Sequence, residues 1–422
     1  MRIETKCVQA GYQPENGQPR ILPIYQSTTY KYDSAEHLGK LFDLTVPGHM
    51  YTRISNPTVE MVEEKIAALE GGVGAMLTSS GQAANLLAVL NIASAGDNIV
   101  CASAIYGGTI NLFGFTLKRL GIEARFFTPE ATDEEISALF DERTRLVFGE
   151  TVANPALIVC DIERLAHIAH AHDVPLVIDN TFPTPVLCRP IEFGCDIVVH
   201  STTKYMDGHA SVVGGCIVDS GNFDWEKACK YPELTEPDES YHGVVYTKSF
   251  GRAAYINKAR AQLMRDFGCT PQPIAAFILN LGLESLAVRM ERHCENAQAV
   301  AEYLEKHSKV SWVNFPGLAS SPQHALAQKY LPNGVCGVIS FGVKGGREAA
   351  MKFMDSLRLA QIVVHVADAR TSVLHPASTT HRQLTDEQLV DAGISADLVR
   401  LSVGIENIED ILEDLEQAFK KI

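Results

Sequence analysis

The chain has 422 residues, of which 46% are hydrophobic, and its formal net charge at pH 7 is -15. This length is sufficient for two or three domains, and the apolar content supports a full core and argues against a disordered chain. The acidic balance argues against a nucleic-acid partner or an anionic membrane surface, and the chain has no basic run that would offset it.

The chain also lacks the marks of export or membrane insertion. Residues 1–10 contain no apolar signal core, and no apolar run approaches the roughly 20 residues that a membrane span needs. The ten cysteines are scattered and form no CxxC pair, which favours reduced thiols over disulfides. We therefore predict a soluble, cytoplasmic protein.

Residues 1–55 are expected to form an irregular arm. Prolines and glycines interrupt its periodicity, while Ile21, Leu22, Ile24 and Tyr25 are too apolar to remain in water. The arm is therefore expected to pack against another surface, such as a second subunit.

From residue 56 onward, predicted helices and strands alternate. Asn56-Pro57 places an N-cap residue before a proline at the first helical position, and Gly71-Gly72 ends that helix. Further helices are predicted at 83–92, 106–120 and 162–171, and strands at 75–78, 98–102, 146–148, 176–178 and 197–199. This alternation is typical of a largely parallel sheet with helices on both faces. We assign 56–250 to this α/β domain.

From residue 251 the pattern changes to long helices followed by a smaller mixed region, which we assign to a second, α+β domain at 251–422. Helices are predicted at 251–267, 273–281, 283–306, 347–357 and 408–419, and strands at 338–343, 362–366 and 398–403. Residues 231–248, which precede this second domain, are predicted to form a long irregular segment. Loops of that length are usually functional or disordered.

Polar residues end three consecutive predicted strands at one edge of the sheet: Glu150, Asp179 and Ser201. Open α/β sheets bind ligands at that edge. Lys204 follows closely, and burial beside other cations can make such a lysine a nucleophile that forms a Schiff base. Ser201 and Thr203 offer hydroxyls suited to a phosphate. For this stretch alone, a solvated turn is at least as good an interpretation.

Other candidates also allow two interpretations. Asp179 could meet a protonated ring nitrogen or a structural arginine, and Tyr106 could stack on a flat ring or pack under a loop. Arg400 could bind a substrate carboxylate bidentately or lie over the sheet. The turn at Ser80-Gly81-Gln82 could bind an anion or simply join a strand to a helix. His167 and His170 have metal-like spacing, but no cysteine or carboxylate cluster joins them, so we predict no metal site.

Eight motifs occur together and in order along the chain. They are Tyr51-x-Arg53-x-x-Asn56-Pro57-Thr58, Ser80-Gly81-Gln82, Tyr106-Gly107-Gly108, Asn154-Pro155, Asp179-Asn180-Thr181, His200-Ser201-x-Thr203-Lys204-Tyr205, His375-Pro376-Ala377-Ser378-Thr379-Thr380-His381 and Val399-Arg400-Leu401-Ser402-Val403-Gly404. In this combination the chain resembles the pyridoxal-phosphate-dependent Cys/Met metabolism enzymes. The resemblance implies the aspartate-aminotransferase-like fold (PLP fold type I), with a mainly parallel seven-stranded sheet and a smaller C-terminal α+β domain.

The resemblance also implies a role for each matching residue. Pyridoxal 5'-phosphate would be bound covalently by Lys204, with Asp179 on its ring nitrogen, Asn154 on its ring hydroxyl and Tyr106 on its ring face. Its phosphate would be held by Gly81, Gln82, Ser201 and Thr203, and by Tyr51 and Arg53 of a neighbouring subunit. Arg400 would bind the substrate carboxylate, with Tyr51 nearby. The implied assembly is a homotetramer of dimers that share active sites.

Within the family, two further stretches are similar to the branch that converts O-acetylhomoserine and sulfide to homocysteine and acetate: 232–243 and Asp368-Ala369-Arg370-Thr371. Elimination from methionine and the synthesis of cystathionine are the alternatives, and Gly108 argues against the first because methionine γ-lyases usually have cysteine there. His365 departs from the pattern, which predicts serine or asparagine near the substrate. A non-enzymatic scaffold that binds a sulfur carrier would not need Lys204, Asp179 and Arg400 together.

Overall fold

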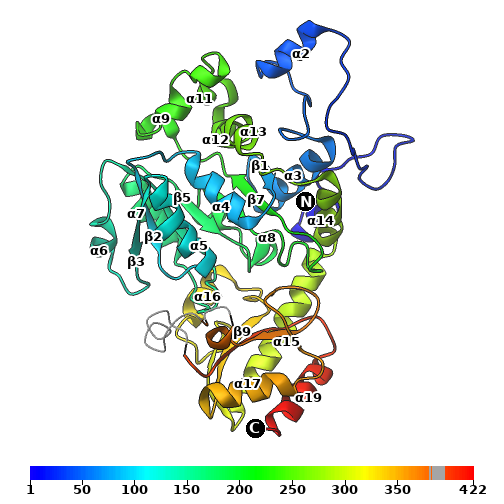
Figure 1. Ribbon diagram of the computed structural model, residues 1–422, viewed down its shortest axis with the longest axis vertical. Helices are drawn as coiled ribbons and strands as arrows, with labels where there is room; N and C mark the ends of the chain where they lie inside the picture. The colour runs from blue at the N-terminus through cyan, green and yellow to red at the C-terminus, as the bar shows by residue number, and fades with distance from the viewer. Residues whose placement is uncertain (380–381, 383–394) are drawn as a thin grey trace.

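The computed structural model describes residues 1–379, 382 and 395–422. A seven-stranded sheet forms the larger part of the molecule (Figure 1), in the order β1 (Gly74–Thr78), β7 (Gly215–Asp219), β6 (Ile197–His200), β5 (Leu176–Asp179), β4 (Thr144–Glu150), β2 (Asn98–Ala102), β3 (Glu123–Phe127). Strands β3, β2, β4, β5 and β6 run parallel, and β7 is antiparallel to both of its neighbours. The prediction of a mainly parallel seven-stranded sheet is confirmed.

Local sequence signals mark the ends of several helices in this part of the molecule. In α3 (Pro57–Glu70), the Asn56 side chain accepts a hydrogen bond from the amide of Thr58, and Gly71 ends the helix at φ 85°. The Asp161 side chain likewise caps α7 (Ile162–Ala171). The other helices here are α4 (Gly81–Leu90), α5 (Gly107–Asn111) with a π-helical turn at Leu112–Leu117, α6 (Asp133–Ser137), α8 (Thr184–Leu187), α9 (Trp225–Ala228), α12 (Ala254–Lys258) and α13 (Arg265–Phe267).

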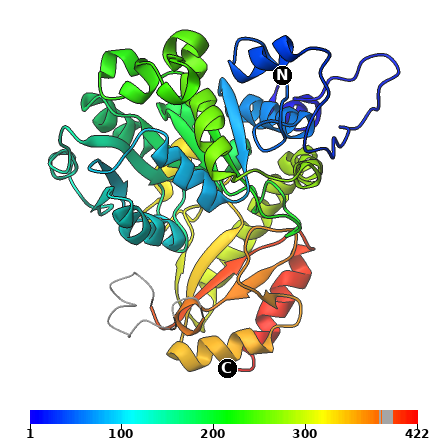
Figure 2. The same cartoon turned by 45° about the horizontal axis from the view of Figure 1, so that its top comes forward.

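A five-stranded sheet forms the smaller part, in the order β10 (Gln361–Ile362), β11 (Ser372–Leu374), β12 (Leu398–Ser402), β9 (Val338–Val343), β8 (Val310–Asn314). Helices α15 (Leu286–Lys306), α17 (Gly346–Ser356) and α19 (Ile408–Phe419) lie beside it at the lower end of Figures 1 and 2. Helix α14 (Pro273–Glu284) packs against α3, and α16 (His324–Tyr330) follows β8. The boundaries that we place at 55/56 and 250/251 stay predictions.

Strands β3, β7, β8 and β11 were not predicted, and three segments differ from the expectations stated for them. Residues 1–55 contain two helices, α1 (Ile3–Gln9) and α2 (Ala35–Phe42), although the rest of this segment is irregular and parts of it extend away from the body in Figures 1 and 2. Residues 231–248 include α10 (Pro232–Thr235) and the start of α11 (Tyr246–Phe250). The strand expected at 362–366 ends at Ile362, and Val364 is exposed. The last two residues of the predicted motif 375–381 lie outside the described residues.

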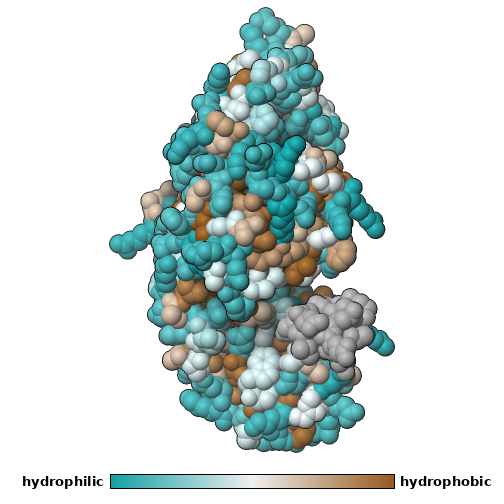
Figure 3. Space-filling view, turned by 90° about the vertical axis from the view of Figure 1, so that its left-hand side faces the viewer, coloured by the Kyte–Doolittle hydropathy of each residue, from teal (hydrophilic) through white to brown (hydrophobic). Residues whose placement is uncertain are grey.

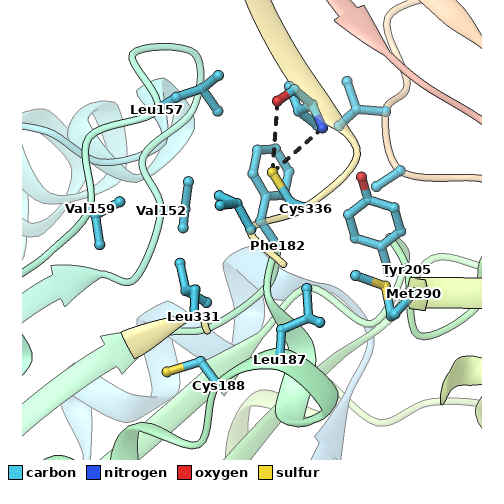
Figure 4. Packing of buried hydrophobic residues seen from close by; sticks show 14 of the residues in the cluster. Val152, Leu157, Val159, Phe182, Leu187, Cys188, Tyr205, Met290, Leu331 and Cys336 are labelled. Carbon is cyan, nitrogen blue, oxygen red and sulfur yellow. Dashed lines mark hydrogen bonds between the residues drawn. The ribbon is translucent and has the colours of Figure 1, made fainter. Parts of the chain in front are cut away.

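Buried apolar side chains join the two parts of the molecule. Phe182, Leu187 and Tyr205 from the larger part lie beside Leu331 and Cys336 from the smaller part (Figure 4). The Tyr205 hydroxyl also accepts a hydrogen bond of 2.8 Å from the backbone amide just before β9. The residue after Lys204 is therefore anchored in the interface between the two parts.

On the face shown in Figure 3, hydrophilic side chains predominate and apolar ones form separate patches. In the described part of the chain, no single helix is long and apolar enough to cross a membrane. The bent pair α14 and α15, whose axes differ by 59°, meets the criteria of length and composition.

Candidate functional site

The candidate site lies at the carboxyl edge of β4, β5 and β6. The parallel register sets Glu150 opposite Asp179 and Asp179 opposite Val199, and the chain then continues through His200 and Ser201 toward Lys204. Glu150, Asp179 and Ser201 therefore follow neighbouring parallel strands at one edge of the sheet, as predicted. The C-terminal sheet contributes the opposite wall through Arg400.

Lys204 is mostly buried, and its ammonium group has few compensating contacts. Burial lowers the pKa of Lys204 to about 8, and the cationic Arg400 adds to this effect. Nζ of Lys204 lies 3.5 Å from Nδ1 of His365, at the outer limit of a hydrogen bond. About a tenth of this lysine is therefore a neutral amine at pH 7, far more than for a lysine of ordinary pKa, and a nucleophile or a proton acceptor must be neutral.

Arg400 on β12 points toward Lys204 and not to the surface. Its Nη1 donates to Oδ1 of Asn154 at 3.3 Å, and its Nη2 donates to the carbonyl of Val364 at 3.1 Å. Its Nε is buried and has no hydrogen-bond partner in the described residues. Burial lowers the pKa of Arg400 to about 10, so the group stays charged at neutral pH. A buried cation with an unused donor is suited to an incoming carboxylate.

Asp179 is buried at the end of β5 and is held in one orientation by Thr181. Its Oδ1 accepts hydrogen bonds from the Thr181 amide at 3.0 Å and the Thr181 hydroxyl at 2.5 Å. Burial raises the pKa of Asp179, although these hydrogen bonds and the charge of His200 oppose the rise. A cation placed against this carboxylate, such as a protonated ring nitrogen, would reduce the cost of its burial.

Tyr106 extends over the same edge, and Glu150 fixes the start of its loop. The backbone amide of Tyr106 donates to Oε2 of Glu150 at 2.6 Å, and the amide of Asn154 also hydrogen-bonds this carboxyl. The Tyr106 ring is half exposed and lies against Gly108, where an added Cβ would be 2.5 Å from Cε1 of the ring. Burial, followed by the charge of Asp179, raises the pKa of Glu150 well above its ordinary value.

The N-terminus of α4 meets the loop after β6 at very short range. A Cβ on Gly81 would lie 2.7 Å from Cβ of Ser201, so only glycine permits this approach. Ser80 caps the helix by accepting from the amide of Ala83, while the first amides of any helix lack intrahelical acceptors. The Ser201 hydroxyl lies beside these amides, which together can hold an anion such as a phosphate.

The remaining predicted phosphate contacts lie in different places. The side chain of Gln82 extends beside α5, where Nε2 would be 3.0 Å from a Cβ on Gly108. The Thr203 hydroxyl donates to the carbonyl of Gly214 at 3.1 Å and accepts from its amide at 3.0 Å. Tyr51 and Arg53 are exposed and contact each other, with 5.5 Å from the guanidinium carbon to the ring centre. Within the described residues, neither Tyr51 nor Arg53 contacts Lys204 or Asp179.

Two features of the site were not predicted from the sequence. The contact between His365 and Lys204 was not predicted, although the family resemblance places residue 365 near the substrate, because it depends on how residues 363–368 follow β10. The role of Glu150 in fixing two loops was also missed, although its position at a strand end was noted. Among the histidines of α7, His170 pairs with Oδ2 of Asp196 at 2.7 Å, and the described residues contain no metal-binding group of histidine, cysteine and carboxylate side chains.

Comparisons with known proteins agree with this geometry. The family model described as Cys/Met metabolism PLP-dependent enzyme matches residues 4–420. Homocysteine synthase of Schizosaccharomyces pombe is 49% identical, covering 99% of this chain and 98% of that protein. O-acetyl-L-homoserine sulfhydrylase 1 of Thermus thermophilus is 48% identical, covering 99% and 100%.

A solved structure matches over the full length of both chains. It is a Campylobacter jejuni protein assigned as an O-acetylhomoserine (thiol)-lyase, with 36% identity and a TM-score of 0.96, and it carries N'-pyridoxyl-lysine-5'-monophosphate.

Proposed function

Because this chain belongs to the Cys/Met metabolism PLP-dependent enzyme family, we propose that it converts O-acetyl-L-homoserine and sulfide to L-homocysteine and acetate. The observation that carries the proposal is the likeness, over nearly the whole chain, to relatives named homocysteine synthase and O-acetyl-L-homoserine sulfhydrylase. It would place the enzyme in methionine biosynthesis. The reaction exchanges one group at Cγ of the amino acid and leaves its amine and carboxylate intact.

The residues at the sheet edge fit the cofactor of this family. Its phosphate would lie at the N-terminus of α4 and Ser201, where Gly81 allows the close approach, and Thr203 would shape the adjoining turn. Asp179 would face the ring nitrogen, Asn154 the ring hydroxyl and Tyr106 the ring face. When bound, pyridoxal phosphate withdraws electrons from the substrate carbons, which makes their protons acidic and allows the γ group to leave.

The chain itself would supply orientation and proton transfer. Lys204 would bind the cofactor covalently and, once displaced by the substrate amine, would move protons at Cα and Cβ through Nζ. Its pKa of about 8 supports that role, because a neutral amine is available near neutral pH. Arg400 would bind the substrate carboxylate and so fix which carbon faces Nζ, while Glu150 would keep Tyr106 and Asn154 in position.

Residues of the arm would complete the site of a neighbouring subunit. Tyr51 and Arg53 are exposed and contact each other, and within the described residues they make no contact with Lys204 or Asp179, which supports a phosphate contact made across an interface. We propose a dimer with shared sites, two of which pair into a homotetramer, in the cytoplasm. Activity in a demonstrably monomeric preparation would contradict this arrangement.

Product analysis tests the proposed reaction. The enzyme is incubated with O-acetylhomoserine, O-succinylhomoserine or methionine, each alone, with sulfide or with cysteine, and the amino acids and carboxylic acids are quantified. The proposal predicts homocysteine and acetate only when O-acetylhomoserine and sulfide are both present. Rapid breakdown of methionine without sulfide-dependent homocysteine would instead identify an elimination enzyme, and preference for cysteine as the sulfur donor would identify a cystathionine synthase.

A further inference from the structure

The side chain of His365 connects Lys204 to a buried carboxylate. Its Nδ1 lies 3.5 Å from Nζ of Lys204, and its Nε2 lies 3.8 Å from Oδ2 of Asp368. The second distance is too long for a hydrogen bond but short enough for the carboxylate to stabilise a positive charge on the ring. No other hydrogen bond to Nζ of Lys204 is made within residues 1–379, 382 and 395–422.

The backbone around His365 is anchored on both sides. The carbonyl of Val364 accepts from Nη2 of Arg400 at 3.1 Å, and the amide of Ala367 donates to Oγ of Ser402 at 2.8 Å. Ala367 adopts φ 67°, a left-handed conformation that an alanine takes only at a cost of about 1 kcal/mol. These contacts hold His365 against Lys204 on the same segment that orients Arg400.

We propose that His365 is the proton relay of Lys204: its Nδ1 takes a proton from the Nζ ammonium, so that the amine can bond to the cofactor. One N–H bond of Lys204 breaks and its electron pair stays on Nζ, while a new N–H bond forms on Nδ1. The neutral amine would then be free to condense with the cofactor aldehyde with loss of one water, and Nδ1 would return its proton to the oxygen that leaves. Asp368 offsets the charge on the imidazolium in the meantime. This inference rests on the assignment of Lys204 in the proposed function and not on the identity of the substrate.

Burial and the surrounding charges keep the ring of His365 unprotonated, and Asp368 is positioned to stabilise the charge that forms when the ring accepts a proton. Burial lowers the pKa of His365, and the cations of Lys204 and Arg400 lower it further, while Asp368 and Asp207 oppose them. The ring is therefore neutral at neutral pH, with Nδ1 free to accept when Nε2 carries the proton. Serine or asparagine, which the family resemblance predicts at this position, could accept the hydrogen bond but could not take up the proton.

Recombination of the cofactor-free protein with pyridoxal phosphate tests the relay without measuring turnover. The rate of appearance of the visible lysine–cofactor band is followed against pH in the wild type, His365→Asn and His365→Ala. His242→Asn is the matched control, because His242 is exposed with φ 52°, a conformation that asparagine tolerates. We expect both His365 variants to recombine about 100-fold more slowly, a typical effect of losing a general base, with the control unchanged.

Two further readouts separate a relay from a structural role. Free imidazole should restore the rate of His365→Ala at least about tenfold, and the acid limb of the wild-type pH profile should vanish in His365→Asn. A His365→Asn protein that recombines at the wild-type rate, or a His365→Ala protein that imidazole does not rescue, overturns the inference. If wild type forms no band at Lys204, the proposed function fails as well, whereas a normal wild-type band with unaffected variants overturns the relay alone.

Discussion

Replacement of Arg400 by lysine should weaken recognition of the substrate carboxylate specifically. The guanidinium already donates to Asn154 and Val364, and its buried Nε has no partner, so it can offer a further charge-assisted hydrogen bond that an ammonium in its place cannot align. One such bond contributes about 2 kcal/mol. Because 1.36 kcal/mol corresponds to a factor of ten, kcat/KM for O-acetylhomoserine should fall about 30-fold.

The decisive comparison uses 3-aminopropyl acetate, the analogue of O-acetylhomoserine that lacks the carboxylate. Sulfide-dependent thiol formation is measured for wild type and Arg400→Lys with both substrates, and an unchanged visible cofactor band serves as the control for folding. The variant should equal wild type on the analogue and be about 30-fold worse on O-acetylhomoserine. Equal losses on the two substrates would refute the reasoning, because the arginine would then act on something other than the carboxylate.

Three further changes probe the cofactor lysine, the ring contact and the arm. Lys204→Met should stabilise the cofactor-free protein by about 3 kcal/mol at pH 7. At this pH the lysine is charged in both states, and the fall of its pKa from the ordinary 10.5 to about 8 is the cost of that charge in the folded protein. In denaturant unfolding this gain should shrink between pH 8 and 10.5, and a gain independent of pH would contradict the pKa shift. Gly108→Cys should displace the Tyr106 ring, because Cε1 of the ring would lie 2.5 Å from the new Cβ. The lost stacking of about 1 kcal/mol should weaken cofactor binding about threefold to tenfold. Unchanged cofactor affinity in a spectroscopic titration would argue against contact between Tyr106 and the cofactor ring. Asn56→Ala removes the cap of α3 and the bond from its side-chain amide to the Tyr25 carbonyl, so unfolding free energy should fall by about 1 kcal/mol and hydrogen exchange in residues 20–55 should accelerate. Unaltered exchange there would show that Asn56 does not hold the arm.

Elements whose limits are set by local chemistry were predictable from the sequence. Helix α3 is bounded by Asn56 and Gly71, and strands β4, β5 and β6 each contain a short apolar run that is followed by a polar residue. Strand β3 was not predicted, because charged residues interrupt it at the edge of the sheet. Strand β7 was also missed, since its five residues follow a glycine-rich turn and depend on two antiparallel neighbours.

The residues of the candidate site also fall into two groups, those that local sequence could predict and those that it could not. Residues near strand ends, such as Asp179 and Lys204, could be singled out because parallel strands bring their carboxyl ends to one edge. Their specific roles came from the family resemblance and stay predictions. The approach of His365 to Lys204 joins residues 161 positions apart, and the fixing of the Tyr106 loop by Glu150 spans 44. Such contacts arise from tertiary packing, on which local sequence patterns carry no information.

The central claim is that the cofactor is bound to Lys204, and borohydride reduction followed by peptide mass mapping tests it most directly. Reduction of the coloured protein should abolish the visible band and leave one pyridoxyl group on the peptide that contains Lys204. The most informative competitor is Lys258, whose burial also lowers its pKa to about 8 but whose Nζ donates to the Asn91 carbonyl at 2.8 Å. A pyridoxyl group on Lys258, or on any lysine other than Lys204, would contradict the account.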